Sequence, residues 1–230
     1  MSRSATPWVA KGRGADQTVR NNAPFTPTSG TRRKKITFAA LGTLVVAGAA
    51  VALFLPDRKP ALSIPDRVCA EAVPSTHVKA LLPEKGEPFE EERAVNFTPD
   101  VSRGLGMCDL SGGGRVFEIR YSRLQDPEYN REWVRRDASK PGNIPLSLGP
   151  AGGYVESHSR VELFVDCPYA KGRTDLLEVS VGIGGVPETV DTTRQAALAG
   201  LAADVARVIA RQVERCEGAA DLPDGAPAIG

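Results

Sequence analysis

A run of twenty residues without a charged side chain, Ile36–Leu55, constrains most strongly what this chain can fold into. At about 1.5 Å rise per residue, a helix of this length is about 30 Å long, which matches the hydrocarbon core of a bilayer. Four basic residues directly precede the run: Arg32, Arg33, Lys34 and Lys35. By the positive-inside rule the N-terminus is cytoplasmic and the C-terminal part lies outside. We therefore expect a single-pass protein of the cell membrane, with residues 36–55 as a transmembrane helix.

Two alternatives to an anchor compete for this run. A core helix of a soluble domain normally carries polar side chains on one face, whereas the only polar side chains here are Thr37 and Thr43. A cleaved signal peptide is the stronger alternative, because Ala47-Gly48-Ala49 has the small-x-small form of a cleavage site. Cleavage there would leave an exposed apolar N-terminus, and the leader would carry a basic region of 35 residues. The sequence therefore favours an uncleaved anchor.

The charges divide at the same run. Residues 1–35 hold eight basic residues and one acidic residue, a net charge of +7, whereas residues 56–230 hold 21 basic and 27 acidic residues, a net charge of −6. Residues 1–35 are rich in Ser, Thr, Pro, Gly and Asn and show no hydrophobic period, which predicts a disordered cytoplasmic tail. Only its last four basic residues are clustered, next to the bilayer, so we expect lipid headgroups and no nucleic acid as their partner.

The rest of the chain is long enough for one exported domain. Prolines at positions 56 and 60 indicate a short linker over residues 56–62, and residues 63–217 are sufficient for a single hydrophobic core. Residues 218–230, rich in Pro, Gly and Ala without periodicity, are expected to form a disordered tail. Within the domain, Ser63-Ile64-Pro65-Asp66 predicts the start of a helix that carries Cys69 and stops before Pro74.

Alternating apolar residues predict two hairpins. In the first, Met107–Leu110 and Arg115–Tyr121 flank a glycine turn, and a helix is expected to follow from Asp126 to Asp137. In the second, strands are predicted at 154–157, at 160–167 and around 177–183. A long helix then begins near Asp191-Thr192, with Thr192 and Gln195 at capping-box spacing, and runs to about Cys216. Its apolar stripe consists of Leu198, Leu201, Val205, Val208, Ile209 and Val213.

Each half thus has a cysteine-bearing hairpin followed by a helix. This outline fits either a duplicated unit or a single antiparallel sheet whose hairpins are only superficially alike, and the weak match between individual residues favours the single sheet. In both cases the predicted fold class is α+β: a single-pass transmembrane helix followed by an exported antiparallel sheet packed by helices.

All four cysteines follow the apolar run, a partition that predicts two disulfides in an oxidising compartment. Zinc coordination is disfavoured, because the cysteines are 39, 59 and 49 residues apart and no histidine lies beside them at ligand spacing. Three connectivities are possible. We predict the sequential one, which joins Cys69 to Cys108 and Cys167 to Cys216.

A cysteine in the first exported helix, a second in the strand Met107–Leu110, a terminal amphipathic helix that ends in cysteine, and a composition rich in Ala, Arg and Gly form a recognisable set. In these features the chain resembles the small envelope proteins of actinobacteria. The resemblance covers about residues 63–217 and implies an exported single domain held at the membrane by a helix or a lipid. It implies no catalytic residue, because such families share none.

The sequence lacks the common catalytic motifs. It contains no Gly-x-Ser-x-Gly elbow, no Gly-Lys-Ser/Thr phosphate loop and no His-Glu-x-x-His. We therefore expect no cofactor and no metal, and we predict a membrane-tethered extracytoplasmic binding or scaffold module of the cell envelope, with an envelope protein or polymer as partner. The alternative is an envelope hydrolase whose dispersed site lies near His158, with Glu162 and Asp166. A pocket that joins His158 to a carboxylate would discriminate between the two.

Two further residues admit more than one interpretation. His77 is a second acid–base candidate in a short helix, although a structural role is the simpler interpretation. Trp133, close to Arg135 and Arg136, could contact a glycan or an anionic polymer, but a helix tryptophan more often belongs to the core.

Overall fold

The computed structural model describes residues 59–99, 104–156, 158–168, 175–185 and 191–230. All of them belong to the second of two compact units, Pro56–Gly230. The predicted tail (1–35) and transmembrane helix (36–55) lie outside the described residues and stay predictions. In the described part of the chain, no helix has the length and apolar character needed to cross a bilayer.

The described domain is an antiparallel β-sheet packed with helices, so the α+β prediction is confirmed to this extent. In chain order the elements are β1 (Arg67–Val68), β2 (Val73–Pro74), α2 (Thr76–Leu81), β3 (Glu90–Val95), β4 (Leu105–Gly112), β5 (Arg115–Leu124), α3 (Arg131–Ala138), β6 (Ile144–Ser147), β7 (Gly152–Glu156), β8 (Arg160–Asp166), β9 (Leu176–Gly184), α4 (Thr192–Val208), the π-helical turn η2 (Ile209–Val213), η3 (Ala219–Asp221) and β10 (Ala228–Ile229).

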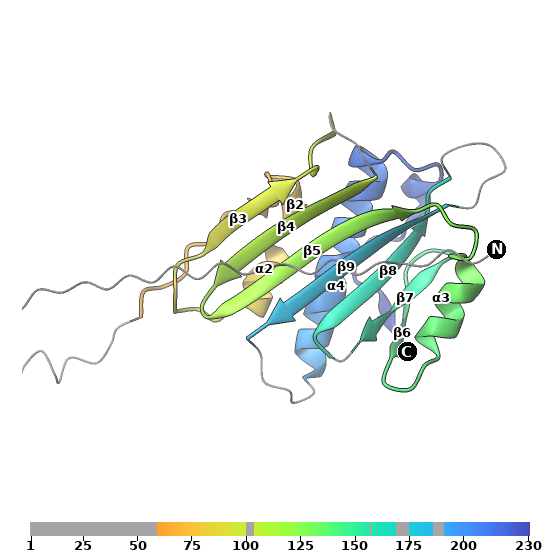
Figure 1. The fold of residues 1–230 in the computed structure, drawn as a ribbon. Coiled ribbons are helices and arrows are strands. Elements are labelled where there is room, and N and C mark those ends of the chain that lie inside the picture. The colour runs from red at the N-terminus through yellow and green to blue at the C-terminus, as the bar shows by residue number, and fades with distance from the viewer. Residues whose placement is uncertain (1–58, 100–103, 157, 169–174, 186–190) are drawn as a thin grey trace, which may run out of the picture. The chain divides into compact units, whose positions relative to one another are not determined.

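Eight strands form the main sheet in the order β10-β6-β7-β8-β9-β5-β4-β3, and every neighbouring pair is antiparallel (Figure 1). The first of the two predicted hairpins is β4–β5, which closes through Gly113 and Gly114, both at positive φ. A two-residue turn of this kind matches the twist of the strands it joins, and glycine adopts it without a steric penalty.

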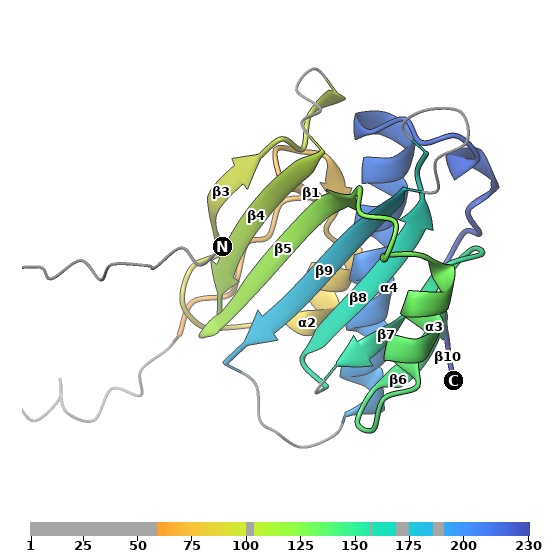
Figure 2. The ribbon, with the colours of Figure 1, turned by 45° about the vertical axis from the view of Figure 1, so that its right-hand side comes forward.

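The helices cover the two faces of the sheet unequally. Val161, Leu163 and Val165 of β8 face the large core beneath α4, whereas the intervening Phe164 packs in a smaller core with Val134 of α3. Because alternate residues of a strand point to opposite faces, α4 and α3 lie on opposite sides. Figures 1 and 2 show α4 behind the strands and α3 beside β7 on the other face. The two hairpins therefore belong to one continuous sheet with helices on different faces, which favours the single-sheet interpretation over a duplication.

Helix α4 provides most of the helical side of the large core. The whole predicted stripe is buried: Leu198, Leu201, Val205, Val208, Ile209 and Val213. The N-cap differs from the prediction, because it is Asp191 whose carboxylate accepts hydrogen bonds from the N–H groups of Thr193 and Arg194. Gln195, expected in a capping box with Thr192, instead contacts His158 with its side chain.

Helix α3 begins later than predicted. The Asp126 carboxylate accepts a hydrogen bond from the Glu128 N–H, and its carbonyl accepts one from Tyr129, so these residues form a local turn. The helix starts at Arg131, and Asn130 is its N-cap. The side-chain oxygen of Asn130 accepts hydrogen bonds from the N–H groups of Glu132 and Trp133. The predicted N-cap, Asp126, was therefore wrong by four residues, because the aspartate caps a turn and not a helix.

The helix predicted from Ser63 through Cys69 is not formed. Residues 67–68 and 73–74 pair as β1 and β2, and the turn between them holds Cys69, Ala70 and Glu71 at φ values of 57°, 56° and 59°. The expected linker 56–62 also differs from the prediction in its described part, since the Leu62 N–H donates to the carbonyl of Glu84 at 3.0 Å. This segment therefore packs along the domain.

Both predicted disulfides are present with the sequential pairing. Cys69 is bonded to Cys108 and Cys167 to Cys216. The first ties the β1–β2 turn to β4, and the second ties the end of β8 to the segment after η2. In the chain-entropy model, loops of 39 and 49 residues make each bond worth about 4 kcal/mol of stability.

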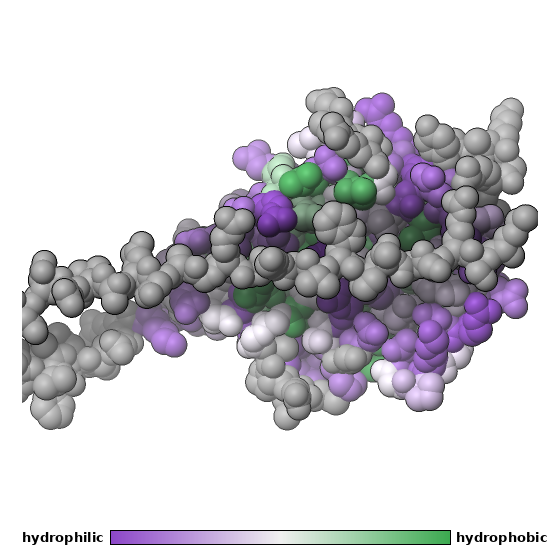
Figure 3. All heavy atoms as spheres, in the orientation of Figure 1, coloured by the Kyte–Doolittle hydropathy of each residue, from purple (hydrophilic) through white to green (hydrophobic). Residues whose placement is uncertain are grey.

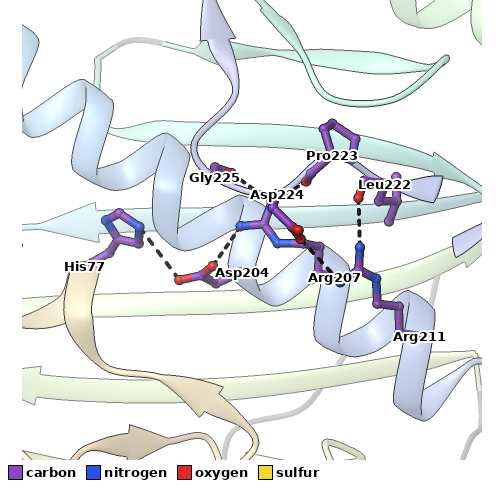
Figure 4. Close-up of polar contacts among 8 residues, drawn as sticks. All are labelled: His77, Asp204, Arg207, Arg211, Leu222, Pro223, Asp224 and Gly225. Carbon is purple, nitrogen blue, oxygen red and sulfur yellow. Dashed lines mark hydrogen bonds and ion pairs between the residues drawn. The ribbon is translucent and has the colours of Figure 1, made fainter. Parts of the chain in front are cut away.

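The C-terminal residues are ordered, in contrast to the disordered tail predicted for 218–230. Strand β10 pairs with β6, and Leu222 is buried. Figure 4 shows how α4 holds this segment: Arg207 donates to the carbonyls of Pro223 and Gly225 at 3.0 and 2.8 Å. We call residues 219–230 the C-terminal strap. The strap is ordered by its contacts with the rest of the domain, so the composition of residues 219–230 alone did not predict this order.

Candidate functional site

Among the described residues, no helix covers most of one face of the sheet. We define the open face as the side chains of β4, β5, β8 and β9 that point away from α4. Helix α3 packs against β7 and β6 at one end of the sheet and leaves the rest of this face exposed. Figure 3 views the open face and shows green hydrophobic side chains among purple hydrophilic ones. The open face therefore carries both apolar and polar side chains, whereas the face beneath α4 is mainly apolar.

A hollow of about 400 Å³ lies on the open face. Four strands contribute to its lining, which consists of Leu105, Met107, Arg120, Tyr121, Ser122, Glu162, Glu178 and Ser180. Its volume lies within the range usual for sites that bind small molecules or single side chains. The hollow is the candidate functional site, because apolar and ionisable groups converge there.

Hydrogen bonds connect the polar groups of the hollow across the strands. Arg160 donates to the hydroxyl of Ser180 at 3.1 Å, and Ser180 donates to Oε1 of Glu162 at 2.9 Å. On the other side, Ser122 donates to Oε2 of Glu178 at 2.9 Å. Each glutamate thus has one oxygen held in place by a serine of the neighbouring strand, which fixes the positions of the two carboxyl groups.

Among the carboxyl groups of the hollow, Glu162 has a raised pKa. Burial raises the pKa of its carboxyl to about 7, the carboxylates of Glu178 and Glu156 add to the rise, and the Ser180 hydroxyl and Arg160 oppose it. Its Oε2 atom is buried and accepts no hydrogen bond from any described residue. A buried acceptor without a partner is unusual in folded proteins, and it marks a position where a further donor would be stabilising.

The basic side chains beside the hollow are held by a different acid. Glu118 contacts Arg120 of its own strand and lies 3.8 Å from Arg160 of β8. Gly182 of β9 lies between them in the register, and a Cβ atom there would be 3.5 Å from the Arg160 guanidinium. With no side chain at Gly182, the Arg160 guanidinium lies across β9 and reaches Glu118.

The sequence candidates for a dispersed hydrolase site do not come together. Glu162 and Asp166 are four residues apart on the extended strand β8, which separates them by about 13 Å, and His158 lies in the turn before this strand. His158 lies 2.6 Å from the amide nitrogen of Gln195, and Asp166 forms a two-bond ion pair with Arg131 at 2.9 and 2.6 Å. Only Glu162 lines the hollow.

The other two candidates have structural surroundings. His77 lies 3.7 Å from Asp204, the carboxylate that also contacts Arg207, as Figure 4 shows. Trp133 packs edge-on against Phe164, with ring centroids 5.5 Å apart, and so belongs to the small core. Among the described ranges, no group of three or more His, Cys, Asp or Glu side chains is arranged to hold a metal ion.

Sequence reasoning missed most of the hollow. The alternation along β5, β8 and β9 predicted which residues of each strand face the core. The residues that alternate with them in the same strand must therefore face the other side of the sheet. Ser122, Glu178 and Ser180 could have been assigned to that side in this way. Their proximity depends on the register between β5, β8 and β9, which the sequence alone does not specify.

Comparisons with protein-family models, with curated proteins and with solved structures found no match. The candidate site therefore rests on the geometry of the chain itself.

Proposed function

We propose that this chain is a membrane-tethered module of the cell envelope that binds a protein partner through the open face. The observation that carries the proposal is the hollow on that face, because it combines exposed apolar surface with fixed ionisable groups. Arg and Met, both present in its lining, are enriched where proteins contact one another. Leu105 supports the same view, since 54 % of its surface is exposed.

Two further observations support the proposed location at the membrane, with the domain outside the cytoplasm. Two disulfides in the domain favour an oxidising compartment outside the cytoplasm. The uncharged run Ile36–Leu55 behind four basic residues favours an uncleaved anchor with a cytoplasmic N-terminus. A linker of only a few residues would keep the exported domain near the bilayer.

We favour binding over hydrolysis because the residues that a hydrolase would need are far apart. The nearest described partner of His158 is the Gln195 amide, which cannot act as the acid or base of a catalytic pair. Glu162 has the raised pKa of an acid–base catalyst, but structural environments also raise the pKa of a carboxyl group.

Photo-crosslinking in the native host tests the proposal. A photoreactive amino acid replaces Leu105 on the open face or, as a control, Ala80 on α2, both of which are exposed. We expect one adduct of defined mass from position 105, recovered in the membrane fraction, and no such adduct from position 80. The adduct should disappear when Ser122→Trp fills the hollow. Identical adducts from both positions, or none from position 105 in the folded protein, would refute the proposal.

A further inference from the structure

The two glutamates of the hollow have acceptor capacity that the described residues do not use. Glu162 Oε1 accepts from Ser180, whereas its Oε2 atom is buried without a partner among the described residues. An ionised carboxylate can accept about four hydrogen bonds, and the serines supply one to each glutamate. Glu162 pairs in register with Ser180, two residues from Glu178 on β9, so the two carboxyl groups are diagonal neighbours on one face.

With Glu162 ionised, the hollow and its rim carry a net charge of −1, because the three carboxylates Glu118, Glu162 and Glu178 outnumber Arg120 and Arg160. Arg120 and Arg160 both contact Glu118, and the nearby Arg93 lies 3.5 Å from Asp109. Burial and the Glu178 carboxylate both disfavour the ionised form of Glu162 and raise its pKa. A donor with a positive charge would relieve this more than a neutral donor, and an anionic group would make it worse.

The apolar part of the lining defines the rest of the ligand. Leu105 and Met107 of β4 lie on the same face of the strand and line the hollow together with the carboxyl groups. This arrangement fits a linear alkyl chain that ends in a cation, because the chain would contact the two apolar side chains while its charged end meets the glutamates. An ammonium group carries three N–H donors, which can be shared between two carboxylates.

We infer that the hollow binds an alkylammonium group, the side chain of a lysine in the partner protein, between Glu162 and Glu178. This inference rests on the proposed function, and it names the group by which the partner is recognised. The alkyl part of the lysine lies against Leu105 and Met107, and its ammonium group donates to Glu162 Oε2 and to Glu178.

The chain contains an internal reporter for this test. It has two methionines, of which Met107 lines the hollow and Met1 lies in the N-terminal tail. We would label the methionine methyl groups of the full chain in detergent micelles with ¹³C and titrate n-butylammonium at about pH 8, where this probe is charged. The expected result is a saturable shift of the Met107 signal without a shift of the Met1 signal. Butanol, which matches the alkyl chain without the charge, should have little effect.

Variants separate recognition of the charge from apolar contact. Glu162→Gln and Glu178→Gln should each weaken the butylammonium affinity about tenfold, since each removes a charge-assisted hydrogen bond. The matched control is Glu128→Gln, which removes an exposed glutamate in the turn before α3 and should leave the affinity unchanged. An equal response to butanol and butylammonium, or unchanged affinity in both hollow variants, would overturn the inference.

The two proposals can fail separately. If position 105 still forms its adduct in cells when Glu162→Gln and Glu178→Gln are combined, the open face binds its partner without a lysine in the hollow, and only the inference is lost. If butylammonium binds as expected but position 105 forms no adduct, the hollow recognises free amines, and the proposed protein partner is lost instead.

Discussion

The carboxylate of Glu91 on β3 accepts a hydrogen bond from the backbone N–H of Cys69 at 2.7 Å. Its other oxygen accepts from the N–H of Ala70 at 2.8 Å. Both donors belong to the β1–β2 turn, in which Cys69, Ala70 and Glu71 all have positive φ although none is glycine. Left-handed backbone costs about 1–2 kcal/mol per non-glycine residue, so a charged acceptor directed at this turn offsets part of its strain.

The run of three glutamates provides a matched test of this contact. We expect Glu91→Gln to lower the free energy of unfolding by about 1–2 kcal/mol, because charge-assisted hydrogen bonds to two backbone donors are weakened. Glu90→Gln and Glu92→Gln alter exposed neighbours and should each change it by less than about 0.5 kcal/mol. Urea unfolding of the full chain measures all three. Equal effects at the three positions would contradict the capping role.

A second prediction concerns the ion pair between Arg123 and Glu214, whose atoms are 2.9 Å apart and whose side chains are only 7 % and 2 % exposed. Glu214→Gln should destabilise the domain by about 3 kcal/mol, because it removes the negative charge that pairs with a buried guanidinium. The exposed pair Lys79–Asp66 is the control, and Asp66→Asn should change the stability much less. Comparable losses in the two variants would show that burial does not govern the strength of these pairs.

The raised pKa of Glu162 predicts how stability depends on pH. Between about pH 4.5, where this carboxyl ionises in the unfolded chain, and about pH 7, where it ionises in the folded one, the folded state binds more protons. The free energy of unfolding should therefore fall as the pH rises through this window. Glu162→Gln should remove this dependence and be more stable than the parent at pH 8, by about 2–3 kcal/mol. A parallel pH profile for parent and variant would exclude Glu162 as the cause.

The C-terminal strap should contribute to stability. Removal of residues 222–230 deletes buried Leu222 and β10 and leaves Arg207 without its two carbonyl acceptors, so we expect a loss of about 3 kcal/mol. The point variant Asp224→Asn, at an exposed contact with Arg211, should cost almost nothing. Thermal melts of the two variants compare them directly. An unchanged melting temperature after the truncation would mean that the strap does not contribute to the fold.

A fifth prediction concerns Gly200 of α4, which lies beneath the imidazole ring of His77. A Cβ atom at position 200 would be 2.4 Å from the ring, so an alanine would force His77 to move away from Asp204. In the His77→Ala background, Gly200→Ala should stabilise the domain by about 1 kcal/mol, through helix propensity alone. In the parent the same substitution should stabilise less or destabilise. A double-mutant cycle measures the difference, and a coupling near zero would contradict the packing.

The sequence predicted the parts of the fold that depend on strong local periodicity. The β4–β5 hairpin, the buried stripe of α4 and the two disulfides all agree with the structure. The β1–β2 turn could not be predicted, because its left-handed residues are not glycines and its stabilising partner, Glu91, is about twenty residues away. The late start of α3 was missed because Asp126 and Asn130 are both acceptable N-caps.

The candidate site was only partly accessible from sequence. Glu162 was among the residues considered, but it was grouped with His158 and Asp166, which the extended strand places far apart. Its actual neighbours, Glu178 and Ser180, depend on strand register, for which no local signal exists. The strap was missed for a related reason, because its order depends on Arg207 of α4 and Arg211 of η2, which precede it in the chain.

The π-helical turn η2 has a consequence for how this domain tolerates changes in length. In this turn the Glu214 N–H donates to the carbonyl of Ile209, five residues back, so the turn holds one residue more than an α-helix would. Deleting one residue between 209 and 213 would give a regular helix and remove a local irregularity. The same deletion would leave the orientation of everything beyond it almost unchanged, because the wider turn takes up its extra residue with almost no added rotation about the helix axis. Glu214 would then still point at Arg123 and Cys216 at Cys167, so a deletion in η2 should preserve both long-range links, whereas a deletion in the regular part of α4 should break them.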